Sequence, residues 1–115
     1  MPTTSGNWND LKEPRHGVMI HYSAGSFTGT VAWCLDPRSK VSYNAVVSQQ
    51  GGLELLAPWT KRAWHAGVCR PSDLRLPYRD ANSAFEGIAL AASAGDKVTH
   101  AAFTRLVALI RERFQ

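Results

Sequence analysis

The order of apolar and polar residues predicts short strands interleaved with two helices. Short apolar runs that end at a turn signal are typical of buried strands, and strict alternation is typical of strands with one solvated face. The run that carries His21 is of the first kind, because it closes in a Ser-Ala-Gly turn. A Gln-Gly-Gly turn joins two other runs into an expected hairpin. The predicted strands cover residues 17–22, 41–48, 53–57 and 85–92.

Alternation within the second strand predicts which of its side chains share a face. One face is expected to carry Val41, Tyr43, Ala45 and Val47. The other face then carries mainly polar residues, among them Asn44. This strand therefore places two candidate site residues, Tyr43 and Asn44, on opposite faces.

Two helices are predicted from residue spacing and end signals. The first covers residues 30–35 and stops at an Asp-Pro turn. The second begins after Thr99, a favourable N-cap, and carries apolar residues at the spacing of one helical face. That predicted stripe consists of Phe103, Leu106, Val107, Ile110 and Phe114. The stripe must pack on the sheet, so we expect an α/β fold: one domain with a mixed β-sheet flanked by helices.

The segments outside these elements set the expected domain limits. Residues 1–15 are polar, contain two prolines and are interpreted as an N-terminal arm, which leaves residues 16–115 as the domain. Residues 68–82 are rich in turn formers and predict a long surface loop, of a length that is usually functional or mobile.

Composition and charge narrow the class of protein. Of the 115 residues, 44% are hydrophobic and 19% are charged, which suits one globular domain. The net charge of +4 favours anionic partners, but the basic residues are scattered, so no nucleic-acid partner is predicted. The N-terminus lacks the features of a signal peptide and no apolar run reaches the roughly 20 residues of a membrane span, so we expect a cytoplasmic protein as made, without a membrane partner. In that reducing compartment Cys34 and Cys69 are expected to be free thiols.

Four short motifs, in order and with consistent spacing, suggest a family. They are Ile-His-Tyr-Ser-Ala-Gly at 20–25, Val-Ser-Tyr-Asn at 41–44, Ala-Trp-His-Ala-Gly at 63–67, and Gly-Ile-Ala-Leu at 87–90 preceded by Asn82. With them, residues 16–115 resemble the type 2 N-acetylmuramoyl-L-alanine amidases, which include phage lysozyme-type amidases and peptidoglycan recognition proteins. The resemblance implies that family's fold, peptidoglycan or muropeptide as the partner, and zinc-dependent hydrolysis of the amide between N-acetylmuramic acid and L-alanine.

The resemblance also implies roles for individual residues. His21 matches the first zinc ligand of the family, and Tyr43 matches a tyrosine that assists catalysis. Asn44, Trp64 and His65 match positions of the substrate groove. Four of these residues have a structural alternative. His21 is then a hydrogen-bonded core histidine and Tyr43 a strand aromatic, while Trp64 is a packing residue and His65 a turn residue.

Two departures from the family pattern bear on catalysis. Ala89 stands where one branch carries an acid, and Glu86 is no substitute, because residues three apart on a strand face opposite sides. In the family the other two zinc ligands follow the last helix, whereas this sequence ends at Gln115, on that helix. One ligand of the usual three is therefore matched, and zinc sites need three or four. A substitute trio of His21, His65 and Cys69 is the alternative.

Three functional hypotheses follow from the sequence. The first is a zinc amidase domain of a cell-wall-lysing system, such as a phage endolysin that reaches the wall after release. The second is a module that keeps the groove and binds muropeptide without cutting it. The third is a truncated remnant of the amidase. Zinc content and retention on peptidoglycan distinguish the three.

Overall fold

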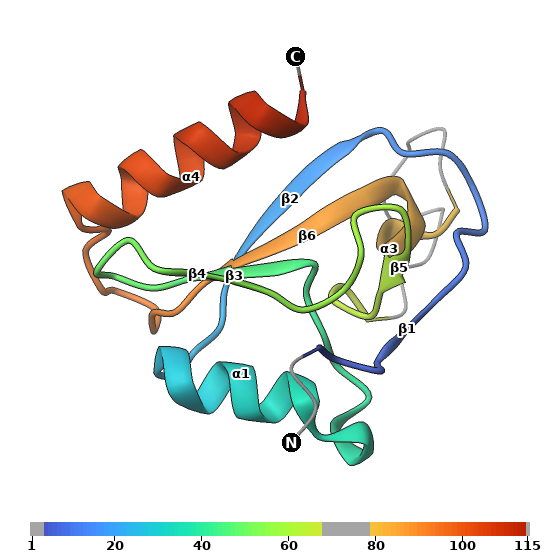
Figure 1. Ribbon diagram of the computed structural model, residues 1–115, viewed down its shortest axis with the longest axis horizontal. Coiled ribbons are helices and arrows are strands. Elements are labelled where there is room, and N and C mark those ends of the chain that lie inside the picture. The colour runs from blue at the N-terminus through green and yellow to red at the C-terminus, as the bar shows by residue number, and fades with distance from the viewer. Residues whose placement is uncertain (1–3, 68–78, 115) are drawn as a thin grey trace.

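The computed structural model describes residues 4–67 and 79–114, and within them strands and helices alternate as the sequence predicts (Figure 1). The predicted strands at 17–22, 53–57 and 85–92 are all present, the last two slightly shorter than expected. In chain order the elements are β1 (Trp8–Asn9), β2 (Gly17–Tyr22), α1 (Phe27–Leu35), the 3₁₀ turn η1 (Pro37–Ser39), β3 (Ala45–Val47), β4 (Leu53–Leu55), β5 (Arg62–Ala63), α3 (Ala81–Ala84), β6 (Phe85–Leu90) and α4 (His100–Arg113).

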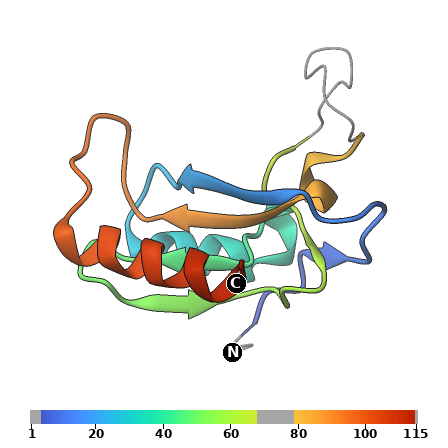
Figure 2. The ribbon, with the colours of Figure 1, turned by 90° about the horizontal axis from the view of Figure 1, so that it is seen from above.

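A mixed sheet forms the centre of the fold, which confirms the predicted fold class. In the described residues it has four strands in the order β2-β6-β3-β4. β2 and β3 both run parallel to β6, and β4 returns antiparallel to β3. β1 and β5 pair separately as a small antiparallel ribbon. Helix α1 covers one face of the main sheet and α4 the other (Figures 1 and 2).

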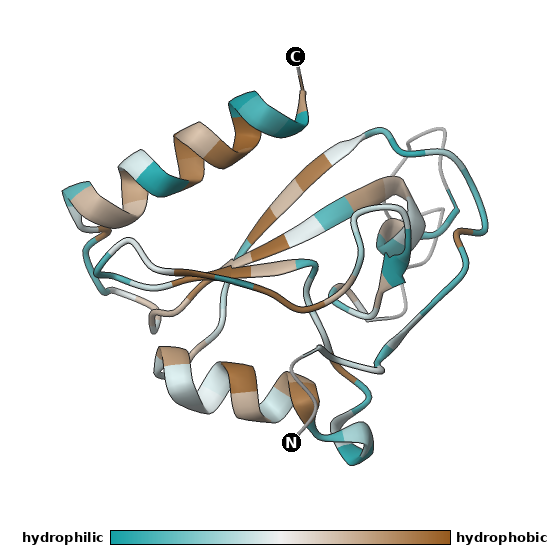
Figure 3. Ribbon diagram, in the orientation of Figure 1, coloured by the Kyte–Doolittle hydropathy of each residue, from teal (hydrophilic) through white to brown (hydrophobic). Residues whose placement is uncertain are grey.

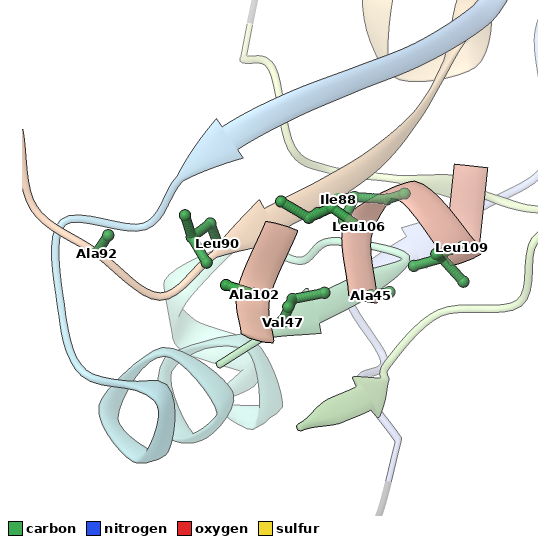
Figure 4. Packing of buried hydrophobic residues seen from close by; sticks show 8 residues of the cluster. All are labelled: Ala45, Val47, Ile88, Leu90, Ala92, Ala102, Leu106 and Leu109. Carbon is green, nitrogen blue, oxygen red and sulfur yellow. The ribbon is translucent and has the colours of Figure 1, made fainter. Parts of the chain in front are cut away.

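The hydrophobic core is divided between the two faces of β3 and β6. On the α4 face, Ala102, Leu106 and Leu109 pack on these strands (Figure 4). The strand residues of that cluster are Ala45, Val47, Ile88 and Leu90. On the α1 face the cluster consists of Cys34, Val46, Leu56, Ala89 and Ala91. Figure 3 shows apolar residues where these strands cross the centre of the molecule, and hydrophilic residues at both ends of α4.

The predicted apolar stripe of α4 is wrong in part. Leu106 is buried, but Phe103 and Phe114 are 60% and 49% exposed. The side of the helix that meets the sheet instead carries Ala102, whose small side chain permits a close approach. Arg105 lies outside this buried side, where its Nε donates to the Gly51 carbonyl at 2.9 Å. The predicted N-cap is correct: the Thr99 side chain accepts from the Ala102 amide.

The second predicted strand is shorter than 41–48, and its alternation fails at Asn44. The carbonyl of Asn44 accepts from the amides of both Leu56 and Ala57, at 2.9 and 3.4 Å. Asn44 lies at a bend, and the regular pairing of β3 with β4 covers only Ala45–Val47, so the alternation of β3 does not extend back to Tyr43. Tyr43 therefore packs with the α1-face cluster rather than with Ala45 and Val47.

Other boundaries differ by a few residues. α1 begins at Phe27 because Ser26, whose side chain accepts from the Gly29 amide, caps it earlier than expected. The end of the predicted 68–82 loop forms α3, and residues 68–78, with Cys69, lie outside the described residues. Cys34 is a free, buried thiol. No helix in the described part of the chain has the length and apolarity to cross a membrane.

The segment before β2 is bound to the rest of the domain. Strand β1 pairs with β5, which places Trp8 opposite Ala63. The buried Asn7 donates from Nδ2 to the carbonyls of Cys34 and Val41, at 3.2 and 2.9 Å. These bonds place the segment beside the Ala-Trp-His-Ala-Gly motif.

Candidate active site

Three aromatic side chains predicted for the site meet on the α1 face of the sheet. His21 lies near the end of β2, opposite Ala89 of β6, while Tyr43 precedes β3 and His65 follows β5. The ring centroid of His21 is 5.4 Å from that of Tyr43 and 5.1 Å from that of His65. His21 Nε2 and His65 Nδ1 are 2.9 Å apart, within hydrogen-bond distance. The structure thus brings His21, Tyr43 and His65 together.

His65 is held from its backbone and from its ring. The amides of His65 and Ala66 donate to Asn82 Oδ1, at 3.0 and 2.7 Å. The ring contacts the Phe85 carbonyl through Nε2, at 3.0 Å. It also lies directly against Gly87, where an added Cβ would be 2.4 Å from His65 Cγ. The imidazole therefore fills the space that a side chain at position 87 would occupy.

The bonds of the two rings fix where their protons lie. A carbonyl oxygen only accepts hydrogen bonds, so His65 Nε2 must carry a proton and donate to Phe85. In the neutral ring His65 Nδ1 is then an acceptor, and His21 Nε2–H donates to it. Burial lowers the pKa of His65 to about 4 and also lowers the pKa of His21. Both imidazoles are accordingly neutral at pH 7.

Tyr43 is half-buried beside His21, and burial raises the pKa of its phenol. The hydroxyl therefore stays protonated around neutral pH. A protonated phenol can donate a hydrogen bond to an oxygen that gains negative charge during a reaction.

Helix α3 places Asn82 beside His65. The carboxylate of Asp80 caps this helix, accepting from the amide and the hydroxyl of Ser83 at 3.2 and 2.6 Å. Arg62 pairs with the same carboxylate at 2.6 Å, and this contact holds the pKa of Asp80 at about 2. The helix ends at Ala84 and β6 begins at the next residue, Phe85.

A cleft of about 650 Å³ is lined in part by His65, whereas His21 and Tyr43 are not among its lining residues. Trp64 and Asn82 line it, and Trp64 Nε1 donates to Asn9 Oδ1 at 3.2 Å. The basic residues of the lining are Lys12, Lys40, Arg62 and Arg79. Since the lining carboxylate of Asp80 is paired with Arg62, the cleft carries a surplus of positive charge.

Asn44, predicted to bind substrate, is fully buried and serves the backbone instead. Its Oδ1 accepts from the Gly87 amide at 2.9 Å, and its Nδ2 donates to the Pro58 carbonyl at 3.0 Å. Both ends of the amide are engaged, so its side chain has no surface toward the cleft. By accepting from the Gly87 amide, Asn44 holds the stretch of backbone against which the His65 ring packs.

Arg15 is a residue of this site that sequence reasoning missed. Its Nη1 donates to the carbonyl of Phe85 at 2.9 Å, the same oxygen that accepts from His65 Nε2. In the described residues its guanidinium donates to five carbonyls, those of Asn82, Ser83, Phe85, Trp59 and Lys61. No local sequence pattern identifies Arg15, which precedes β2, as a residue that binds several carbonyls. Asn82 and Gly87, in contrast, belong to the Gly-Ile-Ala-Leu motif and the asparagine that precedes it.

Comparison with protein-family models matches residues 11–115 to the family described as N-acetylmuramoyl-L-alanine amidase. The chain belongs to the N-acetylmuramoyl-L-alanine amidase family. It is 26% identical over 66 residues to N-acetylmuramoyl-L-alanine amidase A of Achromobacter lyticus, across 56% of this chain and 37% of that protein. The chain therefore spans little more than a third of the length of that curated relative.

Solved structures agree on the fold of this amidase-family domain. The crystal structure of a selenomethionine AmpD derivative superposes with a TM-score of 0.74 at 21% identity, over 92% of this chain and 68% of that one. The family resemblance and the fold predicted from the sequence are both confirmed.

The resemblance implies a zinc ion in this amidase-family domain, and the metal-ligating side chains near His21 are the ones that could hold it. Among residues 4–67 and 79–114, no group of three or more His, Cys, Asp or Glu side chains is placed to hold a metal ion. Two imidazoles, those of His21 and His65, do meet there. Imidazole nitrogen is a preferred zinc ligand, but two imidazoles are fewer than the three or four ligands that zinc sites use, so the described residues supply only part of such a site.

Proposed function

We propose that this domain binds peptidoglycan and hydrolyses the amide between N-acetylmuramic acid and L-alanine, as part of cell-wall lysis of the phage endolysin kind. The observation that carries the proposal is the meeting of His21, Tyr43 and His65 beside a cationic cleft, in a chain of the amidase family. The family supplies the reaction class, and the three side chains supply the groups that such a reaction uses.

The cleft supports an anionic glycopeptide as the ligand. Peptide stems of peptidoglycan carry carboxylates, and lysine and arginine side chains in the cleft attract them. The indole of Trp64 offers an apolar surface to a sugar or peptide group. His65 lines the cleft and also contacts His21, so a ligand held in the cleft would lie next to the ring cluster.

Tyr43 is proposed to stabilise the transition state of amide hydrolysis. Its phenol stays protonated and lies beside His21, from where it donates to the oxyanion that forms on the amide carbonyl. Removing one such donor typically costs about 10²–10³-fold in kcat. Tyr43→Phe is therefore expected to lower turnover by about that factor while leaving binding to peptidoglycan intact.

His21 is proposed to hold zinc. When bound, zinc would lower the pKa of its coordinated water toward 7 and polarise the amide carbonyl. The residues of this chain contribute the rest: the cleft orients the glycopeptide, and the neutral His21 offers a nitrogen lone pair without first losing a proton.

A second candidate function is binding without cleavage. It is favoured by the donor count, since the described residues bring only two metal-ligating side chains together. Such a module would retain the cationic cleft and hold muropeptide as a recognition protein does.

One experiment separates the two functions. The zinc-supplemented chain is incubated with purified peptidoglycan, and new N-terminal alanine is measured together with co-sedimentation of the protein. New N-terminal alanine that falls strongly in Tyr43→Phe supports the amidase, and co-sedimentation without new alanine supports the binding module. Absence of both overturns the proposed function. His100→Ala, a change at an exposed position of α4 remote from the site in the fold, is the control variant.

A further inference from the structure

Two arginines from distant parts of the chain bind consecutive residues of β6. Arg15 Nη1 donates to the Phe85 carbonyl at 2.9 Å, and the same oxygen accepts from His65 Nε2. Arg113, in the last turn of α4, binds the carboxylate of Glu86, donating from Nη2 to Oε1 at 2.8 Å and from Nε to Oε2 at 3.2 Å. Both arginines therefore act within one residue of the carbonyl that orients the His65 ring.

Trp59 contacts both arginines as well. Its carbonyl accepts from Arg15 Nη2 at 3.1 Å, and its ring centroid lies 4.6 Å from the guanidinium carbon of Arg113. Burial lowers the pKa of Arg15, while the charge of Glu86 raises it and that of Arg113 lowers it. Two cations and one acid therefore form a single electrostatic cluster at the start of β6.

Glu86 depends on a cationic partner because it is buried. Its side chain is 5% exposed, and within residues 4–67 and 79–114 its carboxylate is bonded to Arg113 alone. A buried ion pair that loses one partner leaves an uncompensated charge in the interior, which is strongly unfavourable. Without Arg113, the cation placed to compensate Glu86 is Arg15.

Arg15 has a nitrogen available for such a contact. Its Nε is buried and has no hydrogen-bond partner in the part of the chain that the structure describes. Its two Nη atoms bind backbone carbonyls, including those of Phe85 and Asn82. Since a charge-assisted bond to a carboxylate is stronger than a bond to a carbonyl, Glu86 released by Arg113 would draw Arg15 away from these carbonyls.

We propose that Arg113 is a positioning residue for His65. By holding Glu86, it leaves Arg15 on the Phe85 carbonyl. That carbonyl in turn orients the His65 ring. The last turn of α4 is in this way coupled to the ring cluster on the opposite face of the sheet. The coupling rests on the proposed function only where release of alanine is the readout.

NMR of the ¹⁵N-labelled chain tests the coupling in Arg113→Ala. The hydrogen-bonded Nε2–H signal of His65 should be lost, and the Nε–H signal of Arg15 should move downfield, because that group gains the Glu86 carboxylate as an acceptor. The matched control is Arg111→Ala, which removes the same charge from the same helical turn at an exposed position and should leave both signals unchanged. An unchanged His65 signal in Arg113→Ala overturns the proposal.

A double variant separates this competition from a general loosening of α4. Adding Glu86→Gln to Arg113→Ala removes the carboxylate that draws Arg15 away, so the His65 signal should return. If Arg113 only anchors the helix, the double variant loses the signal as the single variant does, and the proposal is wrong. Should Arg113→Ala fail to fold, as judged by circular dichroism, Arg113→Lys replaces it, with a partial loss of the signal that Glu86→Gln restores.

The peptidoglycan experiment reads a different quantity. Misplacement of His65 should lower alanine release in Arg113→Ala by up to about 10²-fold, while co-sedimentation persists, because Arg113 does not line the cleft. No alanine release from the wild-type chain contradicts the amidase alone, and the NMR comparison still decides the coupling. Full alanine release from an Arg113→Ala variant that has lost the His65 signal overturns the positioning role.

Discussion

Gly87→Ala is expected to destabilise the domain by forcing His65 from its seat. The new Cβ would lie 2.4 Å from Cγ, 2.6 Å from Cδ2 and 2.8 Å from Cβ of His65, whereas ordinary contacts begin at 3.4 Å. The ring must therefore retreat by about 1 Å (3.4 minus 2.4), which stretches its bonds to Phe85 and His21 beyond hydrogen-bonding distance. Overpacking costs about 1–3 kcal/mol and each of the two lost bonds about 1 kcal/mol, so we expect about 3–5 kcal/mol in total.

Urea unfolding measures this loss, and Gly17→Ala is its matched control. Gly17 also lies in a strand of the main sheet, but a Cβ there would be 3.7 Å from the Phe85 ring, an ordinary contact. Gly17→Ala should therefore change the free energy of unfolding by no more than about 0.5 kcal/mol. In NMR spectra, Gly87→Ala should also lose the hydrogen-bonded Nε2–H signal of His65, while Gly17→Ala keeps it.

A double-mutant cycle decides whether the clash is the cause. In the His65→Ala background the obstructing ring is gone, so adding Gly87→Ala should cost less than about 1 kcal/mol, a coupling of at least about 2 kcal/mol between the two sites. If Gly87→Ala costs as much without the His65 ring as with it, the explanation by ring displacement is wrong. The loss would then come from the strand backbone itself.

Three smaller perturbations test the bonds that hold His65. Asn82→Ala should cost about 2–4 kcal/mol in urea unfolding, because one buried and one partly buried amide lose their acceptor. Asn82→Asp, which keeps an oxygen there, should cost less, and equal losses would contradict this explanation. Arg15→Lys should cost about 2 kcal/mol or more, because an ammonium cannot reproduce the guanidinium fork, and a neutral result would show that the clamp is dispensable. Burial lowers the pKa of His65 from 6.5 to about 4, so the unfolded chain binds more protons between these values. Stability should then be complete above pH 6.5 and decline toward pH 4, less steeply in His65→Ala, and parallel profiles would contradict the assignment.

The site depends on backbone groups as much as on its named side chains. The carbonyl of Phe85 orients His65, the amide of Gly87 is held by Asn44, and Asn82 accepts from the backbone after β5. Substitutions at Asn44 should therefore act on activity through folding and through the placement of His65, rather than through contact with a ligand.

The sequence by itself determined the local elements and the family. Apolar runs and turn signals specify the strand that carries His21, and the cap at Thr99 specifies where α4 begins, because periodicity and capping depend on neighbours along the chain. The motif order was enough for the family, since each motif keeps its residue types at fixed local spacing.

Only the tertiary structure determined how these elements pack and which of their residues come into contact. It turned Phe103 of α4 toward solvent, because the small Ala102 allows the closer approach to the sheet. It also joined His21 to His65, which are 44 residues apart in the chain. Contacts of this kind depend on strand order and on the space left by neighbours such as Gly87, and neither is encoded in a local pattern.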